Sequence, residues 1–195
     1  YQCDWSSDVC SSDLYGKIKM FAHLDQPVNA LRNINDGDVS LIFRIGQDFL
    51  YNFYEVKIPL KRTPQGCYTK AQSDKVWPDS NMLDINIADL IAMKVRRNNS
   101  TTGVSNIYRE QFGHKTISIF GNPNLGEVRG VLVGVENTNN DFPIEGEVWI
   151  NELRLSEINE VGAYAALGRV DIQLADLGKL TVSANMHTQI GRAHV

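Results

Sequence analysis

The sequence lacks any apolar run close to the ~20 residues that a membrane-spanning helix requires, which excludes a helical membrane anchor within it. It also lacks a strong excess of one charge. Its 19 lysines and arginines and 23 aspartates and glutamates give a net charge of −4, which predicts neither a nucleic-acid footprint nor attraction to an anionic membrane surface. Cysteine is scarce, and only Cys67 lies outside the first 14 residues. The globular part is therefore expected to contain no internal disulfide.

Both ends of the sequence match a translated sequencing adaptor. Residues 4–14 read DWSSDVCSSDL and residues 190–195 read IGRAHV, which correspond to the two strands of one common short-read adaptor. We therefore expect residues 1–14 and 190–195 to be non-biological, and we exclude them from fold reasoning. Residues 15–189 are then expected to be a piece of a longer protein. The excluded ends carry three acidic residues and one basic residue, so the remaining net charge is about −2.

Short stretches of alternating apolar and polar residues, separated by Gly, Pro and Asn, predict an all-β domain over residues 15–158. A jelly-roll-like antiparallel β-sandwich is the architecture that such spacing favours. The segment Gly130–Glu136 is nearly continuously apolar, which predicts a central strand. The segment Thr63–Ser80 is expected to be a long surface loop. The predicted strands are Lys17–Leu24, Val39–Ile45, Phe53–Leu60, Lys115–Phe120, Gly130–Glu136 and Val148–Leu155.

One helix is expected, over Leu83–Arg97. Asn86 is its candidate N-cap, and Asp89 falls in the first turn. Basic residues near its end suit the helix dipole. The basic residues are Lys94, Arg96 and Arg97, and the apolar stripe consists of Ile87, Leu90, Ile91 and Val95.

Residues 163–189 predict an amphipathic β-hairpin. Two runs alternate with a period of two about a tight turn, so one face is apolar and the other polar. The apolar face is predicted to hold Val170, Ile172, Leu174, Leu180, Val182, Ala184 and Met186. The polar face is predicted to hold Arg169, Asp171, Gln173, Thr181, Ser183, Asn185 and His187.

No motif in the sequence predicts catalysis. A phosphate-binding loop, a GxSxG nucleophile elbow and a dinucleotide fingerprint are all missing. His23, His114 and His187 have no partner at metal-ligand spacing, so each is expected to be structural or solvated. Cys67 lies in a polar loop without a nearby activating base. The sequence therefore predicts no enzyme, and no catalytic, cofactor-binding or metal-binding residue.

Three weaker signals have ordinary structural interpretations beside functional ones. The segment Asn33–Asp38 is rich in the oxygen ligands that calcium prefers, but its spacing departs from the EF-hand pattern, so a polar turn is expected. The carboxylate pairs Asp36 with Asp38 and Glu145 with Glu147 are expected to be turn residues. Trp149 faces away from Val148 and Ile150, and a core or interdomain anchor is favoured over a sugar-stacking platform.

Several segments, taken in order, resemble a known family. They are Gly121–Leu125 (GNPNL), Val148–Leu155 (VWINELRL), Gly162–Val170 (GAYAALGRV) and Leu174–Gly178 (LADLG). This combination resembles the SprA/Sov family, the gliding-motility cell-surface proteins that form the outer-membrane translocon of the type IX secretion system.

The resemblance implies a non-catalytic piece of a large transmembrane β-barrel in the outer membrane of a Gram-negative bacterium. The expected partners are other secretion-system subunits, secreted cargo proteins and, at the hairpin, outer-membrane lipid. No cofactor is implied. The polar face of the hairpin would then line a hydrated pore, and its apolar face would meet lipid. Two alternatives stay open: a cell-surface carbohydrate-binding β-sandwich module that ends in a hairpin, and a soluble β domain of unassigned function.

Overall fold

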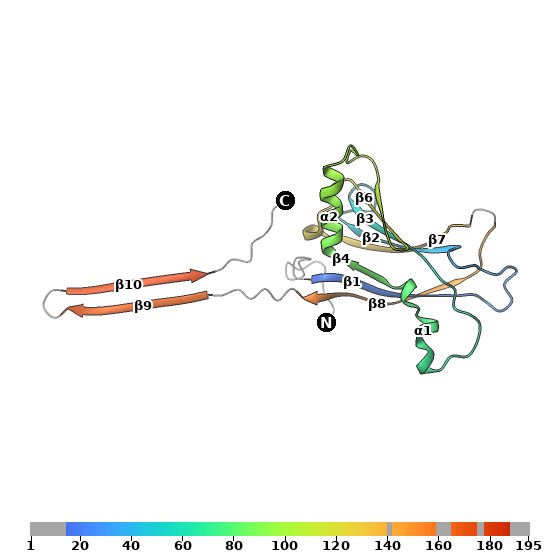
Figure 1. Cartoon of the computed structure of the whole chain (residues 1–195), viewed down its shortest axis with the longest axis horizontal. Coiled ribbons are helices and arrows are strands. Elements are labelled where there is room, and N and C mark those ends of the chain that lie inside the picture. The colour runs from blue at the N-terminus through green and yellow to red at the C-terminus, as the bar shows by residue number, and fades with distance from the viewer. Residues whose placement is uncertain (1–14, 140–141, 159–164, 175–177, 188–195) are drawn as a thin grey trace. The chain divides into compact units, whose positions relative to one another are not determined.

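Two antiparallel sheets face each other as the layers of a sandwich (Figure 1). The computed structural model describes residues 15–139, 142–158, 165–174 and 178–187. The chain divides into two compact units, Tyr1–Ile158 and Asn159–Val195. The first unit contains the sandwich, and the second contains a two-stranded hairpin.

The strand order of the sandwich confirms the predicted jelly-roll-like fold. The smaller sheet runs β4-β1-β8 and the larger sheet runs β5-β6-β3-β2-β7. The pairs β1 with β8, β2 with β7 and β3 with β6 are nested, as expected when one long antiparallel ribbon is rolled up. The strands are β1 (Tyr15–Asp25), β2 (Val39–Gly46), β3 (Phe53–Pro59), β4 (Leu83–Asn86), β5 (Tyr108–Phe112), β6 (Lys115–Phe120), β7 (Gly130–Asn137) and β8 (Glu147–Ile158).

The core consists of the inward positions that the sequence alternation predicted. The inward residues of β1, β2 and β3 are each at most 7% exposed, because strand side chains alternate between the two faces of a sheet. Residues of both sheets and of helix α2 (Ile87–Asn98) join in one apolar cluster. The β1, β2 and β3 members are Ile18, Met20, Ala22, Leu24, Val39, Leu41, Phe43, Ile45, Tyr54, Val56 and Ile58.

The predicted helix begins four residues later than expected. Leu83–Asn86 forms strand β4, which pairs with β1, and α2 starts at Ile87. Leu83 and Ile85 are buried and alternate with polar residues, so these four positions follow the period of a strand. Asn86 occupies the N-cap position, but its side chain donates to Asp89 Oδ2 at 2.9 Å and makes no bond to the helix backbone.

The apolar stripe predicted for the helix is only half buried. The buried side chains of α2 are Ile87, Leu90, Met93 and Arg97. Ile91 and Val95 belong to the predicted stripe but are 48% and 42% exposed. The helix therefore packs on a face rotated towards Met93 and leaves one apolar flank in solvent.

Strand β7 was predicted to be central and lies instead at the edge of the larger sheet, so this prediction was wrong. The sequence of β7 looks continuously apolar because glycines, Gly130 and Gly134, occupy outer-face positions where an edge strand would usually carry polar residues. Glycine adds no polar character to a pattern but brings no side chain to bury. The sequence also did not predict β5, the one-turn helix α1 (Ser73–Val76) within the long loop, or three short 3-10 helices.

The second unit is a hairpin of β9 (Ala165–Leu174) and β10 (Gly178–His187). The two strands pair along their whole length, from Ala165 opposite His187 to Leu174 opposite Gly178. This pairing confirms the predicted hairpin. The exposure of its side chains lies outside what the structure describes.

The two ends of the sandwich are distinguished by where β8 begins and finishes. We call the end at which β8 finishes, at Ile158, the exit end, and the opposite end the distal end. Tyr15 of β1 pairs with Ile158 at the exit end, and Asp25 pairs with Glu147 at the distal end. Helix α2 lies on the exit side of the sandwich and runs crosswise to the strands (Figure 1).

A hydrogen-bonded turn at the exit end joins β2 to β3. Asp48 Oδ1 accepts the backbone amides of Leu50 at 2.8 Å, of Tyr51, and of Asn52 at 3.1 Å. The hydrogen bond from the Tyr51 amide is the main cause that lowers the pKa of Asp48 to about 2, with further bonds from Asn52 and Leu50. Asp48 is therefore the residue that organises this turn.

We expect the Asp48 turn to make stability depend on pH. Because the folded pKa lies below the ordinary value of 3.8, the contribution of Asp48 is complete above about pH 4 and is lost as pH falls towards 2. The variant Asp48→Asn should be less stable than the parent at neutral pH, and the difference should shrink on acidification. Denaturant midpoints of both proteins across this range test the prediction, and a constant difference between them would contradict it.

Candidate functional site

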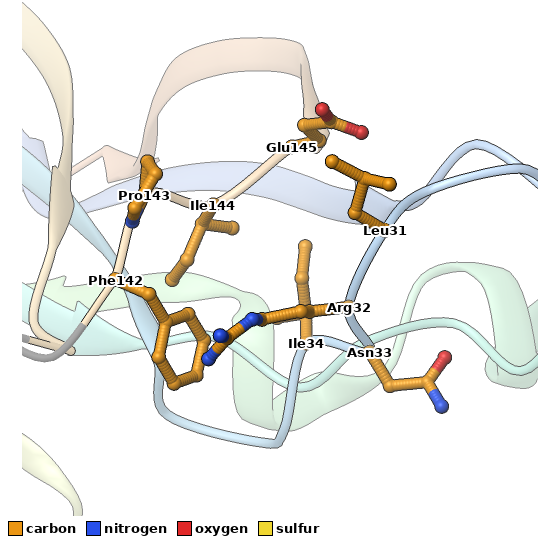
Figure 2. Close-up of a pocket in the computed structure, with 8 residues that line it drawn as sticks. All are labelled: Leu31, Arg32, Asn33, Ile34, Phe142, Pro143, Ile144 and Glu145. Carbon is orange, nitrogen blue, oxygen red and sulfur yellow. The ribbon is translucent and has the colours of Figure 1, made fainter.

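A pocket lies at the distal end of the sandwich (Figure 2). Its volume is about 250 Å³, and two loops that are far apart in sequence form its walls. One loop joins β1 to β2, and the other precedes β8. The lining residues are Leu31, Arg32, Asn33, Ile34, Phe142, Pro143, Ile144 and Glu145.

A buried glutamine holds the first wall of the pocket. Gln26 is 4% exposed, and its Oε1 accepts from the Ile34 amide at 3.0 Å and from Arg62 Nη1 at 2.9 Å. Its Nε2 donates to the Arg32 carbonyl oxygen. Because both the oxygen and the nitrogen of one buried amide are used, the turn is fixed from inside.

An arginine stacks on an aromatic ring across the pocket. The guanidinium carbon of Arg32 lies 4.4 Å from the centre of the Phe142 ring, within the range of a cation–π contact. Figure 2 shows the two side chains meeting, with Ile144 above the Phe142 ring and Glu145 at the top of the view. The pocket therefore offers an apolar wall, one stacked cation and one carboxylate. This arrangement suits a contact with a peptide or loop and provides no nucleophile.

The oxygen-rich segment Asn33–Asp38 forms a polar turn whose carboxylates have protein partners. Asp38 Oδ2 accepts from the backbone and side-chain nitrogens of Asn35 at 2.9 and 3.2 Å, and Asp38 Oδ1 accepts from Asn139 Nδ2 at 3.3 Å. Asp36 Oδ1 accepts from the Arg62 amide at 3.1 Å. Within residues that the structure describes, no group of three or more His, Cys, Asp or Glu side chains could hold a metal ion.

Two of the three histidines between residues 15 and 189 fasten the long loop to the sandwich. Nδ1 of His23 lies 2.7 Å from the Val76 carbonyl oxygen and 2.9 Å from Thr63 Oγ1. The His23 ring also stacks at 5.5 Å against Trp77. Nε2 of His114 lies 2.7 Å from the Ser80 carbonyl oxygen. Their contacts are those of structural residues, and the side chain of His187 lies outside the described residues.

The remaining candidate residues are dispersed over the sandwich. Cys67 is an exposed free thiol in the long loop. Glu145 lines the distal pocket, whereas Glu147 begins β8 opposite Asp25, so the structure does not combine them into a catalytic pair.

Trp149 lies on the outer face of the smaller sheet. It pairs with His23, whereas its neighbours Val148 and Ile150 pair with the buried Leu24 and Ala22. The predicted orientation relative to these neighbours is confirmed. Trp149 is 59% exposed, which contradicts a position in the sandwich core, and its interpretation as an interdomain anchor stays a prediction.

The sequence analysis missed the distal pocket and several exposed apolar side chains. Arg32, Phe142 and Ile144 lie in segments without periodicity, and nothing in their spacing brings them together. Ile91 and Val95 were visible as apolar positions, but the face on which α2 packs decides their exposure. The exposure of an apolar helix position can therefore be determined only from the folded structure.

The described residues thus define a class of protein: a β-sandwich domain followed by a two-stranded antiparallel hairpin. A family model described as SprA_N, motility related/secretion protein, matches residues 10–191. The chain belongs to this family and is a motility- or secretion-related protein. No curated protein matches the sequence. Among the helices that the structure describes, none is long and apolar enough to cross a membrane.

Proposed function

We propose that the chain is a non-catalytic part of a SprA-like outer-membrane translocon for type IX protein secretion and gliding motility. In this proposal the sandwich is a folded domain of the translocon, and β9 and β10 are strands of its transmembrane barrel. Membership of the SprA_N family supports a role in secretion or motility. The hairpin supplies the physical argument for the barrel.

The register of the hairpin is the observation that carries the proposal. Val170 pairs with Val182, and Ile172 pairs with Leu180. The intervening positions pair polar with polar, including Arg169 with Ser183 and Asp171 with Thr181. Residues directly opposite each other belong to the same face of an antiparallel pair. The alternation is therefore in step across both strands from Arg169 to Leu174, whereas Leu167 pairs with the polar Asn185.

The length and the alternation of β9 and β10 suit a barrel wall. Each strand has 10 residues, and a tilted membrane-crossing strand needs about 9–11. Barrel strands in membranes alternate apolar residues towards lipid with polar residues towards the lumen. A two-stranded hairpin alone is at best marginally stable in water, so further strands or lipid must complete this unit.

The proposal assigns partners by location. The apolar face of the hairpin meets outer-membrane lipid, and the polar face meets the water-filled route of the secreted cargo. The distal pocket, with its stacked Arg32 and its apolar wall, suits contact with another secretion-system subunit.

We expect charge on the apolar face of the hairpin to disrupt assembly. The variant Val170→Arg should cost about 2–4 kcal/mol of membrane stability if the residue lies near the middle of the bilayer. The matched control is Asp171→Arg, one position further and on the polar face. The measurement is the fraction of protein assembled in the outer membrane, with secreted cargo as a second readout. Equal losses for both variants would contradict the proposal.

The carbohydrate-binding alternative rests on one side chain. Trp149 is exposed on a sheet face, and exposed aromatic rings are the surfaces on which sugars stack. Trp149 does not line the distal pocket. The translocon proposal accounts for the hairpin and for the family, and the alternative accounts for Trp149 alone.

A further inference from the structure

Exposed apolar side chains concentrate at the exit end of the sandwich. Among residues whose burial is described, 12 large apolar side chains are exposed, and six of these lie on α2 and the two loops beside it. These six side chains form what we call the exit patch. They are Leu50 (70% exposed), Tyr51 (67%), Ile91 (48%), Val95 (42%), Val104 (51%) and Ile107 (45%).

Hydrogen bonds join the three segments of the exit patch through the turn after β6. Lys94 Nζ donates to the Pro123 carbonyl oxygen at 2.9 Å, and Arg97 Nη1 donates to the Gly121 carbonyl oxygen. The Gly121 amide donates in turn to the Val104 carbonyl oxygen at 3.0 Å. Gly121 also packs so closely on Tyr51 that a Cβ atom there would lie 1.7 Å from the Tyr51 oxygen. These contacts place the three segments that carry the patch next to one another.

An ion pair ties α2 to β5. Arg96 donates to both carboxylate oxygens of Glu110, at 2.8 and 2.6 Å, and the Tyr108 hydroxyl donates to Glu110 Oε1 at 2.9 Å. The charge of Arg96 thus has its partner within the protein. The exposed flank of α2 presents Ile91 and Val95, which are one helical turn apart and share a face.

The location of the patch connects it to the hairpin. Only residues 159–164 separate the end of β8 from the start of β9, and an extended chain spans at most about 3.5 Å per residue. A bilayer that holds β9 therefore lies within about 25 Å of the exit end. This step rests on the proposed function.

We propose that the exit patch is a membrane-contact surface, which inserts into the interface of the bilayer that the hairpin crosses. Aliphatic side chains with a tyrosine among them suit this region, because tyrosine keeps its hydroxyl in water and its ring among lipid. None of the six side chains of the patch is charged. Contact is therefore driven by apolar insertion and does not require anionic lipid.

The test measures lipid contact at single labelled positions. The three cysteines are first replaced, as Cys3→Ser, Cys10→Ser and Cys67→Ser. One new cysteine is then introduced and labelled with an environment-sensitive fluorophore. Val95→Cys and Leu50→Cys report on the patch, and Leu31→Cys, equally apolar and exposed but at the distal end, is the matched control. Val182→Cys reports separately on the hairpin. The probe is a phosphatidylethanolamine–phosphatidylglycerol nanodisc that carries the protein and a small fraction of nitroxide lipid. The nitroxide sits near the headgroup for the patch positions and at the middle of the acyl chain for Val182.

We expect nitroxide quenching to be several-fold stronger at Val95 and Leu50 than at Leu31, and unchanged when phosphatidylglycerol is omitted. Quenching at Val182 without quenching at the patch would overturn the inference and leave the proposed function intact. Quenching at the patch without quenching at Val182 would support the patch and contradict the barrel strands. Equal quenching at the patch and at Leu31 would also overturn the inference, and so would a requirement for anionic lipid.

Discussion

Replacement of Gly121 by alanine is expected to cost about 2–5 kcal/mol of folding stability. Gly121 has a φ of +70°, in the left-handed region that side chains disfavour. An alanine Cβ there would also lie 1.7 Å from the Tyr51 carbonyl oxygen, so the backbone of the β2–β3 turn would have to move. Adding a Cβ at Gly121 would therefore incur two costs: the unfavourable backbone conformation and the clash with Tyr51.

Gly113 provides the matched control for this substitution. It has a similar φ of +61°, but no atom lies within 4 Å of the position that a Cβ would take. Gly113→Ala should therefore show the conformational cost alone, about 1–2 kcal/mol. Denaturant unfolding of both variants gives the comparison. Equal losses would show that the close approach between Gly121 and Tyr51 contributes nothing.

Removal of the Arg97 side chain should produce the second large effect. Arg97 is 1% exposed at the end of α2, which is unusual for a charged residue. Its Nη1 donates to the Gly121 carbonyl oxygen, and its Nε and Nη2 donate to Asn98 Oδ1 at 3.2 and 2.9 Å. Arg97→Ala would leave a cavity and remove the partner of a backbone carbonyl, at a cost of about 2–4 kcal/mol.

The neighbouring tyrosine stays neutral beside this arginine. Burial raises the pKa of Tyr54 to about 12, although the charge of Arg97 acts in the opposite direction. Arg97 is therefore held by neutral hydrogen-bond acceptors and not by a phenolate. The control is Arg96→Ala, which removes an exposed guanidinium one residue earlier and should cost much less. Thermal unfolding of both variants tests the difference, and a larger loss for Arg96→Ala would contradict this description.

Sequence patterns predicted the elements whose alternation is strict. In β1, β2 and β3 every second residue is large and apolar, and the structure buries those residues at the predicted positions. Strand β4 has only two apolar residues, which is too short an alternation to distinguish it from the first turn of the helix that follows. Strand β5 reads YREQF, with three polar residues in the middle, and it gave no apolar alternation to detect.

The features that the sequence did not predict depend on which distant segments of the chain meet in the fold. The edge position of β7 follows from which strands it meets, and glycine on its outer face hid the difference. The orientation of Trp149 was predictable from alternation, but its exposure was not, because exposure depends on what covers the outer face of the sheet. The distal pocket needs Arg32 and Phe142 together, and only the folded chain brings their loops into contact.

The family and the hairpin constrain the function in different ways. The SprA_N match assigns the chain to motility or secretion without specifying a mechanism. The proposed barrel depends instead on the register of β9 and β10, in which apolar positions face apolar positions across the pair. Direct evidence must therefore come from the two faces of this hairpin.

The most direct measurement is the accessibility of single cysteines along β9 in the protein's own membrane. Each variant carries one cysteine between positions 169 and 173, with the native cysteines replaced by serine, and is treated with a maleimide that cannot cross lipid. The proposal predicts labelling at Arg169→Cys, Asp171→Cys and Gln173→Cys and protection at Val170→Cys and Ile172→Cys. Uniform labelling along the strand, or protection of the polar positions, would contradict it.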